Sequence, residues 1–224
     1  MTAISESNSD LAIALLGGSF DPVHCGHLLT ATAAKAALSA WQMRLLPCAQ
    51  SPFKKTSLAN AAQRESMLRL ALTEYPELCI DTRELRRPAP SYTVDTLSEL
   101  RAELGSHRPL IFVLGWDAFV GLPRWHQWRE LFALAHLAVM NRPGVGGDRH
   151  AVLGAELSAL LDERLAARTD LSSRPSGHVC FIEVPAVELS SSIIRTKIAA
   201  GESVDGMMPK AVQQYIHKQA LYVV

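Results

Sequence analysis

Residues 17–28, with the sequence GGSFDPVHCGHL, combine residue types and spacing that could do chemistry. Gly17 and Gly18 would let main-chain amides approach a phosphate closely, because glycine has no side chain to keep the two apart. A helix that begins directly after this turn would point its free N–H groups and positive dipole end toward the same place. His24 and His27 are three residues apart, so both rings lie on one face of the first helical turn. The segment therefore predicts an anion site at which two imidazoles meet one phosphate.

Such a site suits phosphoryl or nucleotidyl transfer. In these reactions the enzyme mainly positions the substrates and stabilises the charge that grows on the phosphorus oxygens, which histidines and main-chain amides can do. Gly26, between the two histidines, removes a side chain where a nucleotide base or ribose could press on the backbone. The pattern favours His24 and His27 as catalytic residues.

Other interpretations of this segment have less support. An HxxH pair alone is often accidental, but two glycines at a strand end favour function. Zinc would need a third and fourth ligand, and Cys25 points away from the face of His24 and His27. The sequence pairs no base with Cys25, which argues against a nucleophilic role. Neither GxGxxG nor GxxxxGK followed by Ser or Thr occurs at this turn, which argues against a dinucleotide-binding dehydrogenase and a P-loop NTPase.

A buried strand and a helix must position these residues. Residues 11–16 form a continuous apolar run ended by two glycines, typical of a strand buried on both faces of a parallel sheet. Residues 27–40 are rich in Ala and Leu with no interior Gly or Pro and predict a helix. Residues 43–46, stopped by a proline, predict a second strand. Together they form one βαβ unit.

The same alternation continues along the chain. Asn60, with Gln63 three residues later, predicts a capped helix that continues to about Glu74. Further strands are expected at residues 78–82, 110–114, 136–140 and 178–184, and further helices at residues 93–104, 151–167, 191–200 and 209–219. We predict a Rossmann-like α/β fold: a doubly wound, mainly parallel sheet with helices on both faces and a small C-terminal helical part, whose ligands lie beyond the carboxyl ends of the strands.

The domain organisation is expected to be simple. We expect a single domain at residues 11–224, whose C-terminal helical part covers about residues 186–224. Residues 1–10 are polar and predict a flexible N-terminal tail, and residues 144–148 predict a flexible surface loop.

Composition limits the classes of function. The chain is 48% hydrophobic and 20% charged, as in globular proteins, and its 22 Lys and Arg balance its 22 Asp and Glu. No global positive field therefore recruits nucleic acid or a membrane, and phosphate recognition must be local. The four cysteines form no CxxC pair and fit a reducing compartment, so we expect the cytoplasm. The apolar run at residues 11–16 is far shorter than the ~20 residues that cross a bilayer, and residues 1–10 lack the basic start of a signal peptide.

Two segments closely resemble those of the nucleotidyltransferase superfamily that is marked by an HxGH motif, here His24-Cys25-Gly26-His27. The second, LSSSIIR at residues 189–195, is similar to the ISSTxIR segment in which a Ser or Thr and the Arg bind ATP phosphates at a helix N-terminus. Hydroxyls and free amides at a helix start, with an Arg one turn inside, form a second anion cradle facing the first. Simple helix capping by the serines is compatible with that role. The resemblance implies that His24, His27 and Arg195 are catalytic and that ATP is bound by Gly17, Gly18, Ser19, Phe20, His24, Gly26, His27, Lys54, Ser191, Ser192 and Arg195.

Further segments resemble the nicotinate mononucleotide branch of this superfamily. The segment SYT at residues 91–93, which follows ELRR at residues 84–87, is similar to its PSYT segment, which holds the pyridine carboxylate through main-chain amides. Gly115-Trp116-Asp117 is similar to its GxD turn, and Arg142-Pro143-Gly144 to its RPG turn. Trp125 matches its aromatic residue that stacks on the pyridine ring. The resemblance implies mononucleotide binding by Asp21, Ser91, Tyr92, Thr93, Asp117, Trp125 and Arg142.

One loop departs from the bacterial members. Where they carry a His after the second Pro of a PxxxxPH segment, this chain has Pro52 and then Phe53, followed by Lys54 and Lys55. Our hypothesis is that Lys54 or Lys55 supplies positive charge to the triphosphate while Phe53 only packs. Two solvated surface lysines are the alternative.

The resemblance covers about residues 11–222. It implies a nicotinate-nucleotide adenylyltransferase of NAD biosynthesis, which transfers AMP from ATP to nicotinate mononucleotide and gives nicotinate adenine dinucleotide and pyrophosphate. It also implies Mg²⁺ held mainly by phosphates and water, small-molecule partners without nucleic acid or membrane, and a monomer or weak homo-oligomer. The alternatives are a pantetheine-phosphate adenylyltransferase, a cytidylyltransferase, or a non-catalytic nucleotide-binding sensor. The preference for nicotinate over nicotinamide mononucleotide and the oligomeric state stay open.

Overall fold

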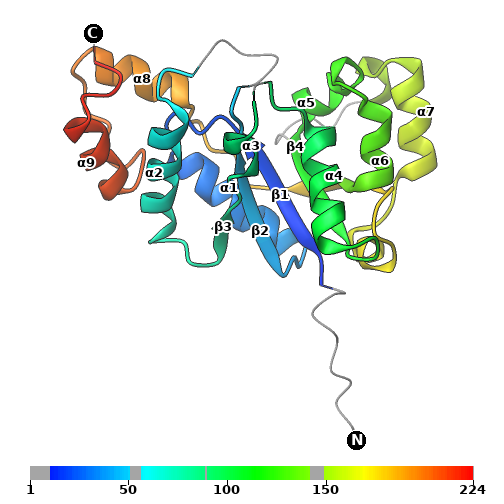
Figure 1. Ribbon diagram of the computed structural model, residues 1–224. Coiled ribbons are helices and arrows are strands. Elements are labelled where there is room, and N and C mark those ends of the chain that lie inside the picture. Colours follow the sequence, from blue (N-terminus) through cyan, green and yellow to red (C-terminus); the bar gives the residue numbers. More distant parts are fainter. Residues whose placement is uncertain (1–10, 51–56, 89, 142–148, 224) are drawn as a thin grey trace, which may run out of the picture. The chain divides into compact units, whose positions relative to one another are not determined.

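The computed structural model describes residues 11–50, 57–88, 90–141 and 149–223 (Figure 1). The chain divides into two compact units. The first unit contains residues up to Leu16, Ala34–Gln42 and Tyr92–Val184. The second unit contains Gly17–Ala33, Met43–Ser91 and the residues from Pro185 onward. Two of the predicted segments, the tail at residues 1–10 and the loop at residues 144–148, lie outside the described residues.

The described strands form one sheet in the order β3-β2-β1-β4-β5-β6. They are β1 (Ile13–Gly18), β2 (Gln42–Pro47), β3 (Leu78–Ile80), β4 (Leu110–Gly115), β5 (His136–Asn141) and β6 (Val179–Glu183). The β1–β4, β2–β3, β4–β5 and β5–β6 pairings are parallel. This order is that of a Rossmann-like α/β fold, so the predicted fold class is confirmed. In such sheets ligands bind beyond the carboxyl ends of the strands, where the strand order reverses beside β1.

Helices connect the strands. They are α1 (Cys25–Ala37), α2 (Ala61–Leu72), α3 (Arg83–Arg86), α4 (Thr93–Leu104), α5 (Trp116–Val120), α6 (Leu131–Leu134), α7 (Ala155–Arg164), α8 (Ser191–Ala199) and α9 (Lys210–Lys218). Short 3₁₀ helices lie at Leu122–Arg124, Trp128–Glu130, Arg149–Val152 and Arg168–Ser173.

The first unit is built on strands that are apolar on both faces. Residues 13–15 of β1 and residues 110–114 of β4 are buried throughout, as expected for parallel strands covered by helices. In this unit α4 packs against α6 (Figure 1). Arg101 of α4 donates hydrogen bonds to the main-chain oxygens of Leu134, at 2.7 Å, and Pro175, at 2.5 Å. The guanidinium therefore joins carbonyl groups from two segments that are distant in the sequence, and it shares the Pro175 oxygen with the Leu110 N–H.

The second unit is organised around α2, which packs against α9 (Figure 1). The predicted helix start is confirmed, because the Asn60 side chain accepts from the Gln63 N–H and the Gln63 side chain accepts from the Asn60 N–H, both at 2.9 Å. The buried face of α2 carries Arg64 together with Met67, Leu68 and Ala71. A charged residue thus lies in the apolar stripe of this helix.

Arg64 is 1% exposed, and its guanidinium binds three main-chain oxygens. It donates to Ser19 at 2.9 Å, to Cys48 at 2.6 Å and to Ala49 at 3.0 Å. Ser19 follows β1, while Cys48 and Ala49 follow β2, so one side chain ties together the turns at the carboxyl ends of two strands.

Element boundaries differ from the sequence prediction in ways that have local causes. The predicted strand at residues 11–16 extends through both glycines to Gly18. The helix predicted at residues 27–40 is α1, which ends at Ala37 because Ser39 adopts a left-handed φ of 48° and the Ala40 N–H turns back to the Lys35 oxygen. The helix predicted at residues 93–104 is confirmed as α4.

Two later predictions were too long. The strand predicted at residues 78–82 ends at Ile80, because Thr82 is the N-cap of the unpredicted helix α3. The helix predicted at residues 151–167 is shorter, Ala155–Arg164, and is flanked by two 3₁₀ helices. The helices α5 and α6 were not predicted, because elements of one turn are too short for periodicity to show.

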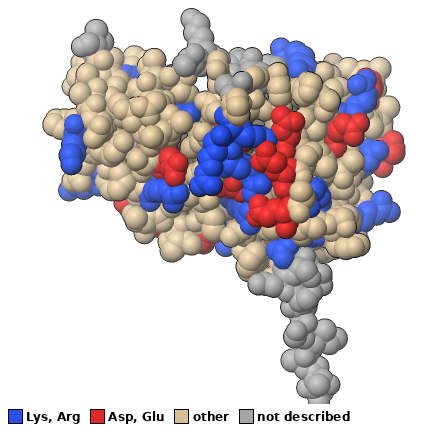
Figure 2. Space-filling model, viewed as in Figure 1, with Lys and Arg blue, Asp and Glu red and all other residues tan. Residues whose placement is uncertain are grey.

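The surface carries charges of both signs. On the face in Figure 2, Lys and Arg lie beside Asp and Glu without a large area of a single sign, which agrees with the formal net charge of zero. None of the helices within the described ranges is long and apolar enough to cross a membrane. All four cysteines are described, and none of them forms a disulfide bond.

Replacing Arg64 tests how far the second unit depends on this buried guanidinium. Arg64→Leu should lower the free energy of unfolding by about 3 kcal/mol or more, because three buried carbonyl groups lose their donor. Urea denaturation followed by circular dichroism measures this change. The matched control is Arg69→Leu on the same helix, where an exposed pair with Glu65 is broken and the expected loss is below about 1 kcal/mol. Equal effects of the two substitutions would show that the buried guanidinium is dispensable.

Candidate functional site

The turn between β1 and α1 brings the two predicted histidines together. The His24 and His27 rings are stacked, with centroids 3.6 Å apart and an interplanar angle of 24°. The main-chain oxygen of His24 accepts from the N–H groups of His27 and Leu28, so His24 precedes the first turn of α1. The edge of the Phe20 ring lies against His27, with centroids 4.9 Å apart. Both imidazoles therefore lie at the helix start, as the spacing predicted.

His24 is electrically neutral at physiological pH. Burial lowers the pKa of its ring from 6.5 to about 4. Its Nδ1 accepts a hydrogen bond from the His27 N–H at 3.3 Å, which leaves the ring proton on Nε2. A neutral ring with a fixed tautomer presents an Nε2–H donor, which suits a developing negative charge on a phosphate oxygen.

Neighbouring side chains leave little room for a Cβ atom at Gly18 and Gly26. A Cβ at Gly26 would lie 2.9 Å from His24 Nδ1 and 3.0 Å from His24 Cε1. A Cβ at Gly18 would lie 3.1 Å from two carbons of the Phe20 ring. The side chain nearest to Gly26 is thus the His24 ring. Our expectation that Gly26 also leaves room for a nucleotide stays a prediction.

The second predicted anion cradle, at the start of α8, is joined to the first by hydrogen bonds. The Ser191 hydroxyl donates to the Pro22 oxygen at 2.9 Å. The Arg195 Nη1 donates to the Asp21 oxygen at 2.6 Å, and its Nη2 donates to the Ser192 hydroxyl at 3.2 Å. All of these residues belong to the second unit. The two segments, more than 160 residues apart in the sequence, thus form one cradle.

The serines of α8 have separate tasks. Ser190 is the N-cap, and its side chain accepts from the Ile193 N–H at 3.2 Å. Ser191 holds the turn after β1, and Ser192 contacts Arg195. Helix capping therefore falls to Ser190, so that Ser192 and Arg195 remain together at the first turn of the helix.

Asp21 is engaged by groups of the chain itself. Its carboxylate accepts from the Leu58 N–H at 2.8 Å, the Ala59 N–H at 3.0 Å and the Tyr222 hydroxyl at 2.7 Å. The residue is 4% exposed. Mononucleotide binding by Asp21 stays a prediction, but these three donors give its carboxylate a positioning task within the second unit.

Ser91, the first residue of the SYT segment, is anchored to the loop after β2. Its N–H donates to the Gln50 oxygen and its hydroxyl accepts from the Ala49 N–H, both at 3.0 Å. Because Arg64 holds both the Ser19 and the Ala49 oxygens, the turn after β1 and Ser91 share one support. Ser91 is buried, and it belongs to the second unit.

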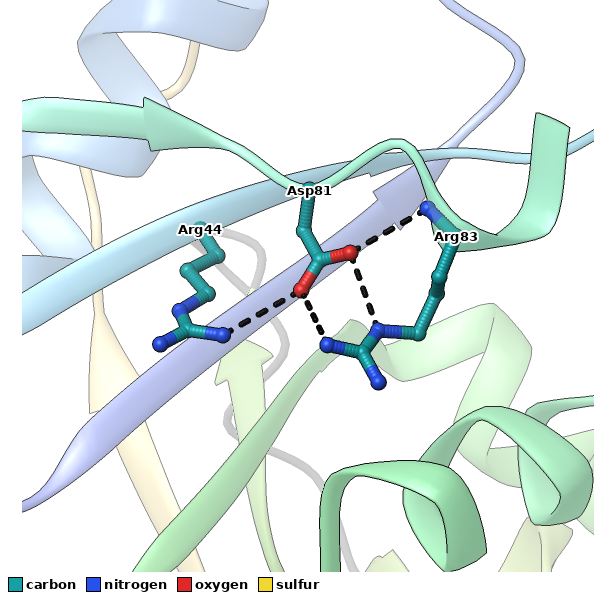
Figure 3. Close-up of polar contacts among 3 residues, drawn as sticks. All are labelled: Arg44, Asp81 and Arg83. Atoms are coloured by element: carbon teal, nitrogen blue, oxygen red, sulfur yellow. Dashed lines mark hydrogen bonds and ion pairs between the residues drawn. The ribbon is translucent and has the colours of Figure 1, made fainter. Parts of the chain in front are cut away.

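A charged cluster holds the chain that leads to Ser91 (Figure 3). Arg44 of β2 and Arg83 of α3 both bind the Asp81 carboxylate, and Arg83 does so with two nitrogens at 2.9 Å. Burial opposes ionisation of Asp81, but the hydrogen bonds and charges of Arg83 and the charge of Arg44 outweigh it and lower the pKa of this carboxyl. The cluster fixes the start of α3 at the end of β3.

The other residues predicted for the mononucleotide belong to the first unit. Tyr92 is the N-cap of α4, which begins at Thr93, and its ring lies 4.4 Å from the His126 ring. Asp117, in the first turn of α5, is exposed. Trp125 packs its edge on Phe112, with centroids 6.1 Å apart.

The three tryptophans near this point differ in burial. Trp116 and Trp128 are in the core, at 8% and 4% exposed, whereas Trp125 is only half-buried. Of the three, Trp125 therefore has the ring surface that a ligand could contact. Two predicted site residues, Lys54 and Arg142, lie outside the described residues, as do Phe53 and Lys55.

Sequence reasoning missed two residues that support the site, Arg64 and Tyr222. Arg64 could have been found from the sequence, because its spacing from Met67, Leu68 and Ala71 places a charged residue on the apolar face of a helix. No sequence pattern could have identified Tyr222, since its partner Asp21 lies near the other end of the chain. Among the residues that the structure describes, no group of three or more His, Cys, Asp or Glu side chains is placed to hold a metal ion.

Comparisons with known proteins agree with this geometry. The cytidylyltransferase-like family model matches residues 15–197. The chain is 41% identical to a probable nicotinate-nucleotide adenylyltransferase of Halorhodospira halophila, over 94% of each chain. It is 43% identical to a protein of the same description from Cellvibrio japonicus, over 94% of this chain and 98% of the relative.

A solved structure shares the fold. It is the Plasmodium falciparum nicotinic acid mononucleotide adenylyltransferase complexed with NaAD, with a TM-score of 0.69 and 18% identity over 95% of this chain and 97% of that one. At this identity the likeness concerns the fold alone.

The buried state of His24 has a measurable pH dependence. The pKa of about 4 in the folded chain lies below the 6.5 of the unfolded chain, so the unfolded state binds more protons between these values. His24 therefore costs no stability above pH 6.5 and destabilises the fold as the pH falls from 6.5 toward 4. An NMR titration of the His24 ring, assigned by its absence in His24→Ala, should show no transition between about pH 5.5 and 8. A midpoint close to 6.5 would contradict the buried, neutral ring.

Proposed function

We propose that this chain, which belongs to the nicotinate-nucleotide adenylyltransferases of the cytidylyltransferase-like family, transfers the AMP part of ATP to nicotinate mononucleotide. The products are nicotinate adenine dinucleotide and pyrophosphate, and the reaction serves NAD biosynthesis. The observation that carries the proposal is the cradle in the second unit. It combines the stacked imidazoles of His24 and His27 with Ser192 and Arg195, joined by hydrogen bonds through Asp21 and Pro22.

The reaction needs no covalent enzyme intermediate. An oxygen of the mononucleotide 5′-phosphate attacks the α-phosphorus of ATP in line; a new P–O bond forms, and the bond from the α-phosphorus to the bridging oxygen breaks. The electron pair of that bond leaves with pyrophosphate. His24 and His27, with the main-chain amides of Gly18 and Ser19, stabilise the charge on the five-coordinate α-phosphorus.

The leaving group is held at the other side of the cradle. Ser192 and Arg195, at the N-terminal turn of α8, would bind the β and γ phosphates through a hydroxyl, a guanidinium and free amides. Gly17, Phe20, Gly26 and Ser191 line or support this binding site. Lys54 is proposed to add positive charge to the triphosphate.

The mononucleotide is proposed to lie against the SYT segment and the residues after β4. Main-chain amides of Ser91, Tyr92 and Thr93 would hold the pyridine carboxylate, and Trp125 would stack on the ring. Asp117 and Arg142 complete the proposed set, with Asp21 supporting the turn that faces the reacting phosphate. The half-buried ring of Trp125, beside two fully buried tryptophans, supports its place in this set.

Mg²⁺ is proposed to accompany the triphosphate. The donors at the start of α8 are hydroxyls, amides and a guanidinium, a set that binds phosphate oxygens rather than a cation. The ion would therefore be held by phosphates and water, with Ser192 and Arg195 fixing the phosphates. When bound, it neutralises charge on the departing pyrophosphate. We further propose that the enzyme works in the cytoplasm on these small molecules.

Pyrophosphate release with matched substrates tests the proposed function. Wild-type protein with ATP and Mg²⁺ should release pyrophosphate with nicotinate mononucleotide, and the dinucleotide product should be found by chromatography. Nicotinamide mononucleotide and phosphopantetheine are run in parallel, measured by a pyrophosphatase-coupled assay. Release with phosphopantetheine alone would favour the pantetheine branch, and no release with any acceptor would favour a nucleotide sensor.

Replacing each cradle histidine tests the assignment of the reacting centre. His24→Ala and His27→Ala should each raise the barrier by roughly 3 kcal/mol or more, a fall in kcat on the order of 100-fold, as for a lost oxyanion donor. The control is His217→Ala at the exposed end of α9, which should keep wild-type rates. If the cradle variants fold and turn over as fast as this control, the two imidazoles do not act on the reacting phosphate.

A further inference from the structure

Tyr222, near the C-terminal end of the chain, reaches back to the turn that holds the catalytic residues. Its hydroxyl donates to Asp21 Oδ1 at 2.7 Å, although the two residues are 201 positions apart in the sequence. After α9 the chain turns, with the Leu221 N–H bound to the Ile216 oxygen and left-handed φ values of 47° at Ala220 and 65° at Tyr222. Such values at non-glycine residues persist only where the surroundings hold them. The phenol contact is one such restraint.

The Asp21 carboxylate is held by three donors from two segments of the second unit. Its carboxylate binds the N–H groups of Leu58 and Ala59, which precede α2, and the Tyr222 hydroxyl. Burial and the neighbouring Asp21 carboxylate raise the pKa of Tyr222, so this hydroxyl keeps its proton and donates it. The side chain of Asp21 is therefore fixed at both oxygens.

The main chain of the same residue holds Arg195. The Asp21 carbonyl accepts from Arg195 Nη1 at 2.6 Å, and the neighbouring Pro22 carbonyl accepts from Ser191. The orientation of the Asp21 peptide thus sets where the guanidinium of Arg195 lies, and His24 follows three residues after Asp21 in the same turn. A change in the position of the Asp21 side chain would therefore displace both Arg195 and His24.

We infer that Tyr222 is a positioning residue for adenylyl transfer: its hydroxyl fixes Asp21, and Asp21 in turn orients Arg195 toward the ATP phosphates. This inference rests on the proposed function, since it assigns ATP to the cradle. Tyr222 would thus contribute to the reaction without being one of the residues assigned to bind either substrate.

Removing only the hydroxyl tests the inference. Tyr222→Phe should lower kcat/KM for ATP by roughly 5- to 10-fold, as expected for the loss of one hydrogen bond to a charged group. The KM for nicotinate mononucleotide should change less than that for ATP, because Asp21 is just one of several residues proposed to bind this substrate and keeps its hydrogen bonds from the Leu58 and Ala59 N–H groups. The matched control is Tyr215→Phe on α9, which should keep wild-type constants. Thermal unfolding confirms that each variant is folded at the assay temperature.

A double-variant cycle separates positioning from a general structural role. In an Arg195→Ala background, Tyr222→Phe should have no further effect on the ATP constants, since it acts through Arg195. If the two effects multiply, or if Tyr222→Phe equals the Tyr215→Phe control in an active enzyme, the inference is wrong. A wild-type protein that releases no pyrophosphate would instead overturn the proposed function, so the two failures are distinguishable.

Discussion

The turn between β1 and α1 depends on two guanidinium groups that bind its main-chain oxygens. Arg64 of α2 binds Ser19, and Arg195 of α8 binds Asp21. A turn that follows a strand has carbonyl groups without regular partners, and leaving them buried and unpaired would cost free energy. With the carbonyl groups held from one side, the turn can keep a fixed shape in which the His24 and His27 rings stack. The stacked arrangement of the two imidazoles is therefore supported by restraints from helices far away in the sequence.

These restraints also shape the local charge. The chain has a formal net charge of zero, yet the turn is contacted by the buried guanidinium of Arg64 and the half-buried guanidinium of Arg195, and it contains the buried carboxylate of Asp21. Charges in a poorly solvated environment act over a longer range than those on the surface. A neutral His24 adds hydrogen-bond donation without further positive charge. The two guanidinium groups thus place positive charge beside the proposed triphosphate site, which bulk composition does not reveal.

The sequence predicted the parts of this arrangement that are encoded locally. The capping box of Asn60 and Gln63, the helix at residues 93–104 and the paired imidazoles follow from spacing within one turn or one helix. The contact of Tyr222 with Asp21 could not be predicted, because no local pattern joins residues at opposite ends of a chain. The need for a small residue at Gly26 could be predicted from its place between the two histidines, but the sequence does not show that the His24 ring lies closest to it.

The SYT segment shows how a site can depend on supports that are not part of it. Ser91 belongs to the second unit, and Tyr92 and Thr93 belong to the first, so the segment crosses from one unit to the other. Its beginning is tied by Ala49 and Gln50 to the loop that Arg64 also holds. A shift of Arg64 would therefore move the turn after β1 and the start of the SYT segment together. Since in-line transfer requires the two phosphates at a fixed separation, a shared support preserves the reaction geometry better than two independent ones would.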